Sequence, residues 1–209
     1  MKNESIVAVI TGDLINSSLL EDKQKEEMES HLIAFLEKTG VLLSIKFFRG
    51  DSFQLMVEKD KAAYTAVIVQ AIIFSTTGTW ARLSIGIGTF SHIVEDNVLR
   101  SQGEAFELSG HQLDRMKTEG RLLRIAIVDD DFQMIIDASL YLLESIIKEW
   151  KPGQAAVIVQ LPYANTQKEI AAKLGISEAA VSKSLKTSNW HAIEAFINAF
   201  EKIINNVFK

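Results

Sequence analysis

The sequence predicts an α+β protein in which an N-terminal antiparallel sheet, covered by helices, is followed by a small all-α domain. Short apolar runs suited to buried strands alternate with segments of helical periodicity as far as about residue 130. Beyond residue 150, every apolar pattern is helical. A hydrophobic content of 47% over 209 residues, with only two prolines, favours a compact and ordered chain.

The first half of the sheet is expected from three apolar segments. Residues 6–10 read IVAVI, which suits a strand buried on both faces, and Asp13 follows closely. A helix over 20–38 should end at Gly40. Strands over 42–48 and 53–57 are separated by a short polar segment with a glycine, which predicts a tight hairpin.

The second half of the sheet begins after a helix that Asp60 is expected to cap and that runs to about Ser75. Residues 81–89 alternate with period two, and one face carries only the small residues Ser84, Gly86 and Gly88. Such a face lets a helix or a ligand lie close to the backbone. A helix over 101–116 and a strand over 122–128 follow. This order resembles a split βαβ sheet of the ferredoxin type with an added helix and strand.

A long amphipathic helix is expected over 132–150, after an acidic cluster at 129–131 that can cap it. It either links the two halves of the chain or pairs with its copy in a second subunit. Lys151, Pro152 and Gly153 interrupt the helical pattern. The expected organisation is therefore a sheet domain over 1–130, a linker helix over 131–150, and a helical domain over 151–209 that Trp190 fills and a helix over 193–207 closes.

Residues 167–186 have the two helices and tight turn of a DNA-binding helix-turn-helix. Thr166 can cap the first helix, and Glu169 would complete a capping box. Gly175 stands where that helix must end with positive φ, and Ser177 can cap the second helix. The apolar side chains that fall on inward faces are those of Ile170, Ala171, Leu174, Val181 and Leu185.

The second of these helices would read DNA, because its outward face is short and polar. Ser182 could bond a base or a phosphate, Lys183 and Lys186 could meet phosphate or guanine, and the Ala179 methyl group could touch a thymine methyl group. The alternative is an ordinary helical hairpin that contacts no nucleic acid. The residues expected to contact DNA are Gln167, Ser177, Glu178, Ala179, Ser182, Lys183 and Lys186.

The charge distribution is consistent with modest DNA affinity. The net charge is −5, but residues 151–209 carry seven lysines and four glutamates, whereas residues 1–150 have a net charge of −8. Few phosphate contacts per subunit imply that a homodimer or a partner protein is needed. The chain contains no cysteine, no apolar run of membrane-spanning length and no signal-peptide pattern, so a cytoplasmic protein is expected.

Asp13 and Asp51 form a possible metal site if the strands that carry them are neighbours. Paired carboxylates on rigid strand ends can hold Mg²⁺ against nucleotide phosphates, and Lys46, Arg49 and Gly50 are the candidate nucleotide-binding residues. Three interpretations are open. The site could sense a nucleotide with Mg²⁺, it could catalyse metal-dependent nucleotidyl transfer, or the two aspartates could simply stabilise turns without a metal.

Four segments resemble parts of class III nucleotide cyclases. VAVITGDLINSS and FFRGDSFQL resemble the metal-binding strand and hairpin, and RLSIGIGT and GEAFELSGHQLDRMK resemble the glycine-bearing strand and the helix after it. The hairpin also resembles that of diguanylate cyclases. The whole chain most resembles the bacterial SatD family, through TGDLINS, RGDSFQ and the serine-glycine helix segment. This resemblance implies a cytosolic bacterial protein with a nucleotide-cyclase-like sheet and a C-terminal helix-turn-helix.

The chain departs from the cyclase pattern at two catalytic positions. When the helix segment is aligned on Gly103, the asparagine and arginine that stabilise the cyclase transition state fall on Glu107 and His111. Glutamate repels phosphate, and histidine cannot replace a guanidinium fork. The sequence therefore predicts a DNA-binding regulator whose degenerate cyclase-like domain senses a nucleotide or mediates dimerisation. The alternative is a Mg²⁺-dependent nucleotide-processing enzyme with a helical adaptor domain.

Overall fold

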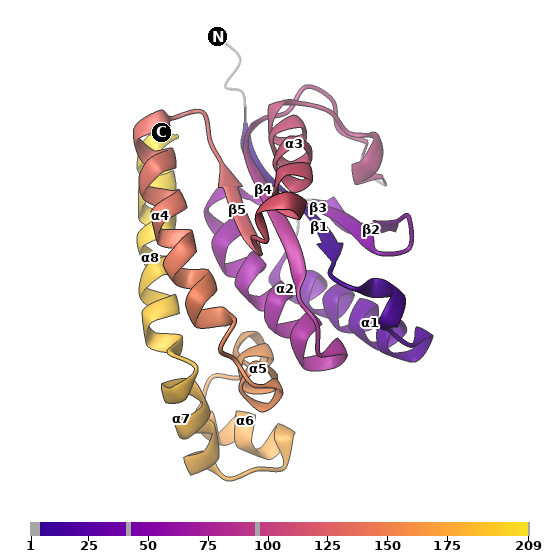
Figure 1. Ribbon diagram of the computed structural model, residues 1–209. Coiled ribbons are helices and arrows are strands. Elements are labelled where there is room, and N and C mark those ends of the chain that lie inside the picture. The colour runs from indigo at the N-terminus through magenta and orange to yellow at the C-terminus, as the bar shows by residue number, and fades with distance from the viewer. Residues whose placement is uncertain (1–4, 41–42, 95–96, 209) are drawn as a thin grey trace.

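A five-stranded sheet lies at the centre of the computed structural model, which describes residues 5–40, 43–94 and 97–208 (Figure 1). The strand order is β2-β3-β1-β4-β5. Neighbouring strands are antiparallel, except that β4 and β5 are parallel. The order of the first four strands is that of a split βαβ sheet, with β5 added at the edge, as the sequence predicts. The strands are β1 (Ile6–Leu14), β2 (Leu43–Phe48), β3 (Ser52–Glu58), β4 (Ala81–Thr89) and β5 (Leu123–Ala126).

Helices cover both faces of this sheet. On one face, Ala8 and Ile10 of β1 join the main hydrophobic core, to which α1 (Asp22–Thr39) and α2 (Ala62–Thr77) also contribute. On the other face, Val7 and Val9 belong to a smaller cluster beneath α3 (Glu104–Glu119). Among the described residues, no helix is long and apolar enough to cross a membrane.

The small face of β4 accommodates α3. A Cβ atom built on Gly86 would collide with the carbonyl oxygen of Ala105, so the helix rests directly on the strand backbone. Gly103 precedes the helix with a φ of 144° and packs against the backbone at Phe90. The expected helix start at residue 101 was wrong, because this close approach holds the preceding residues in extended and turn conformations and delays the helix to Glu104.

The cap predicted for α2 was also wrong. Asp60 lies in a 3₁₀ turn, and α2 begins after Lys61 without a side-chain cap. Asp60 instead accepts a hydrogen bond from the side-chain amide of Asn205, at 3.1 Å. By contrast, Gly40 ends α1 as expected, with a φ of 74°. The 3₁₀ turns are Ser17–Leu19, Lys59–Lys61, Val98–Arg100 and Leu161–Tyr163.

Most of the C-terminal region extends the main core, whereas Ile170, Ala171 and Val181 form a small separate cluster with Val157. Trp150, Ala155, Ile158, Trp190 and Ile193 all belong to the same cluster as the sheet and α2. The indole of Trp150 donates a hydrogen bond to the carbonyl of Ser188, at 3.0 Å. The pattern break at 151–153 therefore marks a change of chain direction within one continuous core. The helices are α4 (Asp130–Ile147), α5 (Pro152–Val159), α6 (Gln167–Leu174), α7 (Glu178–Thr187) and α8 (Trp190–Val207).

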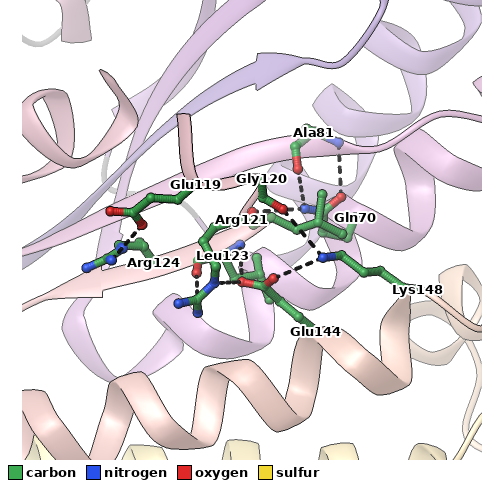
Figure 2. Close-up of polar contacts among 10 residues, drawn as sticks. Gln70, Ala81, Glu119, Gly120, Arg121, Leu123, Arg124, Glu144 and Lys148 are labelled. Carbon is green, nitrogen blue, oxygen red and sulfur yellow. Dashed lines mark hydrogen bonds and ion pairs between the residues drawn. The ribbon is translucent and has the colours of Figure 1, made fainter. Parts of the chain in front are cut away.

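A buried ion pair attaches α4 to the edge of the sheet, as Figure 2 shows. The Nε of Arg121 donates to the Glu144 carboxylate at 2.7 Å, and the Leu123 amide donates to the same oxygen at 3.0 Å. Both charged side chains are only 4% exposed. Burial lowers the pKa of Arg121, but the hydrogen bond and charge of Glu144, helped by Tyr141, leave the pKa above its ordinary value.

We expect Glu144→Gln to lower the free energy of unfolding by about 3–5 kcal/mol, because it leaves the buried guanidinium without a counter-charge. Glu119→Gln is the matched control. It removes a more exposed carboxylate, 2.7 Å from Arg124 in the same region (Figure 2), and should cost less than about 1 kcal/mol. Urea denaturation of both variants measures the difference. Equal losses would show that the Arg121–Glu144 pair is not the stronger attachment.

Candidate functional site

The structure brings Asp13 and Asp51 together at one edge of the sheet, here meaning the end at which β1 finishes and the β2–β3 hairpin turns. Asp13 lies at the end of β1, opposite Ser52 on β3 and Arg82 on β4. Asp51 lies in the hairpin between β2 and β3. The Ser52 hydroxyl is 3.4 Å from an oxygen of each aspartate, so one serine joins the two carboxylates. A second hydroxyl, that of Ser17, donates to Asp51 at 2.8 Å.

Asp13 is already neutralised by basic side chains. It is 7% exposed, and its Oδ2 lies 3.0 Å from Nη1 of Arg82 and 3.9 Å from Nζ of Lys117. Arg82 comes from the neighbouring strand and Lys117 from α3. Neither residue was among the sequence candidates. The register of Arg82 could have indicated its partner only if the strand order had been known.

The ion pairs of Asp13 leave its carboxylate poorly placed to act as a ligand of Mg²⁺. Arg82 and Lys117 both lie against the Asp13 carboxylate, whereas Mg²⁺ in a nucleotide site is bound directly by one or two carboxylates together with the substrate phosphates. Within the part of the chain that the structure describes, no group of three or more acidic or histidine side chains could hold a metal. Lys46 and Arg49 are exposed, and Arg49 and Gly50 turn the hairpin with φ values of 55° and 85°. These contacts favour the structural interpretation for Asp13, and the metal and nucleotide interpretations stay predictions.

We expect Asp13→Asn to reduce the free energy of unfolding by roughly 1–3 kcal/mol, because Arg82 and Lys117 would lose their counter-charge. Millimolar Mg²⁺ with GTP or ATP should leave the melting temperature of the unaltered protein unchanged. Asp51→Asn removes the charge of the other aspartate and serves as the comparison variant for nucleotide binding. A nucleotide-dependent rise in melting temperature that disappears in Asp51→Asn would contradict the structural interpretation and restore the nucleotide-site hypothesis.

The second candidate site is the two-helix unit formed by α6 and α7. Thr166 accepts a hydrogen bond from the Glu169 amide, and Ser177 accepts one from the Ala180 amide, both at 3.2 Å. Gly175 ends α6 with a φ of 65°. The capping box is altered in one respect, because the Glu169 carboxylate accepts from the Asn165 amide rather than from that of Thr166. The unit is held together by Val157, Ile170, Ala171 and Val181, with Leu174 and Leu185 at the margin.

The outward side of this unit is open to solvent at one end of the molecule (Figure 1). Lys183 and Lys186 form no ion pair with any other described residue, and both are exposed. Glu178 and Ala179 lie in the first turn of α7, where backbone amide groups have no partner within the helix. All the residues expected to contact DNA are exposed, namely Gln167, Ser177, Glu178, Ala179, Ser182, Lys183 and Lys186.

A pocket of about 350 Å³ lies where α8 meets α2 and the end of α1, away from both predicted sites. Lys61 and Glu201 form an ion pair across it at 3.1 Å. Burial, with a smaller contribution from Tyr163, raises the pKa of Tyr64 to about 12. The observed contacts at this pocket tie α8 to the start of α2.

The solved structures similar to this chain include nucleotide cyclases. No family model matches the chain, and no curated protein matches it. Two structures of bacterial light-regulated adenylyl cyclases align with 58% of this chain and 43% of theirs at 11% identity, with TM-scores of 0.44 and 0.40. A guanylyl cyclase structure aligns with 53% of this chain and 70% of its own at 14% identity and a TM-score of 0.34. The chain thus spans less than half the length of the adenylyl cyclases.

Proposed function

We propose that this protein is a DNA-binding transcriptional regulator of the SatD type that contacts DNA through α7. The observation that carries the proposal is the outward face of α7, which is polar, exposed and free of ion pairs with the described residues, while its inward face is fixed by Val181. A recognition helix needs this combination, because it must enter a groove without first breaking contacts with its own protein.

Hydrogen bonds to neighbouring elements hold the C-terminal end of α7 in place, so its outward face keeps one orientation. The Gln154 side chain donates to the Thr187 hydroxyl at 2.8 Å, and the Trp150 indole holds the carbonyl of Ser188. Both bonds attach the C-terminal end of α7 to elements packed on α2. A rigid helix loses little conformational freedom when it binds, which favours affinity from a small contact area.

Two of the three segments that carry the SatD resemblance meet in space. TGDLINS and RGDSFQ supply the two sides of the aspartate edge, and their side chains bond across it. The Gln54 amide also donates to the Thr11 hydroxyl at 2.9 Å. The segments thus form one structural unit. We infer that it stabilises the sheet of a cytoplasmic, homodimeric regulator rather than binding a nucleotide with Mg²⁺.

The alternative is a Mg²⁺-dependent nucleotide-processing enzyme in which the helical region is a protein-interaction adaptor. Only the shared edge of Asp13 and Asp51 favours it. The ion pairs of Asp13 with Arg82 and Lys117 count against it.

Replacing Lys183 and Lys186 by alanine should weaken DNA binding strongly and make its salt dependence shallower. Each phosphate contact removed reduces the slope of log K against log salt concentration by about 1 per subunit. Fluorescence anisotropy against sheared genomic DNA at several salt concentrations measures both quantities. The double variant should leave the melting temperature unchanged, because neither side chain packs in the core.

The matched control replaces Lys23 and Lys38 of α1, which are also exposed, and changes the net charge by the same amount. It should bind DNA nearly as well as the unaltered protein. Equal weakening by the two double variants would mean that net charge, and not the α7 face, governs binding. Absence of any salt-sensitive DNA binding by the unaltered protein would remove the proposed function.

A further inference from the structure

Helix α4 has an apolar face that nothing in the described chain covers. Met134 is 74% exposed, Ile135 58%, Tyr141 58% and Leu142 70%. The exposed positions between 132 and 147 also include Ala138 and Ser145, and none of them is charged. The opposite face of α4 is buried against the core through Ile136, Leu140, Leu143 and Ile147. A helix with apolar side chains on both faces has a second surface to bury.

The spacing of this face suits a helical partner. Met134 and Tyr141, Ile135 and Leu142, and Ala138 and Ser145 are pairs seven residues apart. Large side chains flank the small Ala138 and Ser145, which allows the backbone of a second helix to approach closely. A seven-residue repeat of this kind keeps one face of a helix in contact with a partner helix over several turns.

Tyr141 is held in place before any partner arrives. The guanidinium of Arg121 lies 3.5 Å from the centre of its ring, and Arg121 is itself fixed by Glu144. One face of the ring therefore rests on a buried cation, while more than half of the residue remains exposed. An aromatic side chain fixed in this way loses little freedom on binding and is a typical anchor of an interface.

We propose that the occupant of this face is the α4 helix of a second copy of the chain, paired about a two-fold axis. An uncharged face can pair with itself without bringing like charges together. The four large exposed side chains supply about 500 Å² of apolar surface per copy, if each offers about 200 Å² when fully exposed. A standard interface buries about 800 Å² per partner, of which roughly 60% is apolar, so the face matches what a stable dimer needs.

The two helices run parallel in the proposed dimer. In Figure 1, α6 and α7 lie at one end of the molecule. A parallel pair therefore places both α7 helices at the same end of the dimer, whereas an antiparallel pair separates them. This orientation rests on the proposed DNA-binding function, since two half-sites are contacted from one side of the duplex. The pairing of the α4 faces does not depend on DNA.

Single cysteine variants test the orientation cleanly, because the natural chain has no cysteine. In a parallel pair, Ser145→Cys lies close to its own copy and should form a disulfide-linked dimer under mild oxidation. In an antiparallel pair, Ser145 of one copy lies near Met134 of the other. Only a mixture of Met134→Cys and Ser145→Cys proteins would then crosslink, and that outcome would overturn the parallel arrangement.

Analytical ultracentrifugation of the full chain without DNA tests the pairing itself. Leu142→Glu should raise the dimer dissociation constant by about 100-fold or more, and its melting temperature should equal that of the unaltered protein at dilutions where both are monomeric. The control is Leu19→Glu, because Leu19 is 79% exposed but lies far from α4 in the sequence and outside its face. It should leave the dimer intact.

Three outcomes would overturn the proposal. A protein that stays monomeric up to its solubility limit has no α4 dimer. A dimer that survives both Leu142→Glu and Ile135→Glu uses another surface. A monomer that binds lipid vesicles through this face, with binding lost in Leu142→Glu, assigns the face to a membrane surface. Because none of these measurements includes DNA, failure of the dimer is distinguishable from failure of DNA binding.

Discussion

The burial of α2 is the constraint on which the rest of the structure depends. Most of this helix is buried, from Ala62 to Ile73, so it cannot be stable unless it is covered on every side. The sheet and α1 cover one side, and α5 and α8 cover the other (Figure 1). Its buried amide, that of Gln70, is satisfied at the start of β4, where it donates to the Ala81 carbonyl at 2.6 Å and accepts from the Ala81 amide. The C-terminal helices are therefore part of the fold of the sheet.

This shared core explains how the small unit of α6 and α7 is held in a fixed position. The local cluster around Val181 is too small to order α6 and α7 by itself, since isolated short helices are marginal in water. Attachment through Trp150, Gln154 and α8 supplies the missing burial. The same arrangement leaves α4 on the outside, fixed by the Arg121–Glu144 ion pair and apolar on its free face. The proposed DNA contact and the proposed self-association thus fall on different elements, α7 and α4.

Local patterns predicted the elements well, and tertiary contacts account for most of what they missed. The strands, the turn at Gly175 and the Ser177 cap follow from periodicity and backbone preference, which act over a few residues. The late start of α3 and the uncapped start of α2 depend on close approaches to other segments. Arg82 and Lys117 were missed for the same reason, because their partner Asp13 is distant in sequence. The sequence shows the interruption of the helical pattern at 151–153. It does not show that one hydrophobic core continues across this interruption, because that depends on contacts between distant segments.

Native-state hydrogen exchange tests the shared core most directly. If α2 joins the two halves into one cooperative unit, the most protected amides of α2, α5 and α8 will open with the same free energy, equal to that of global unfolding. Opening of α5 and α8 at a clearly lower free energy, while the sheet and α2 remain protected, would contradict this account. The C-terminal helices would then be an independent unit attached to a self-sufficient sheet.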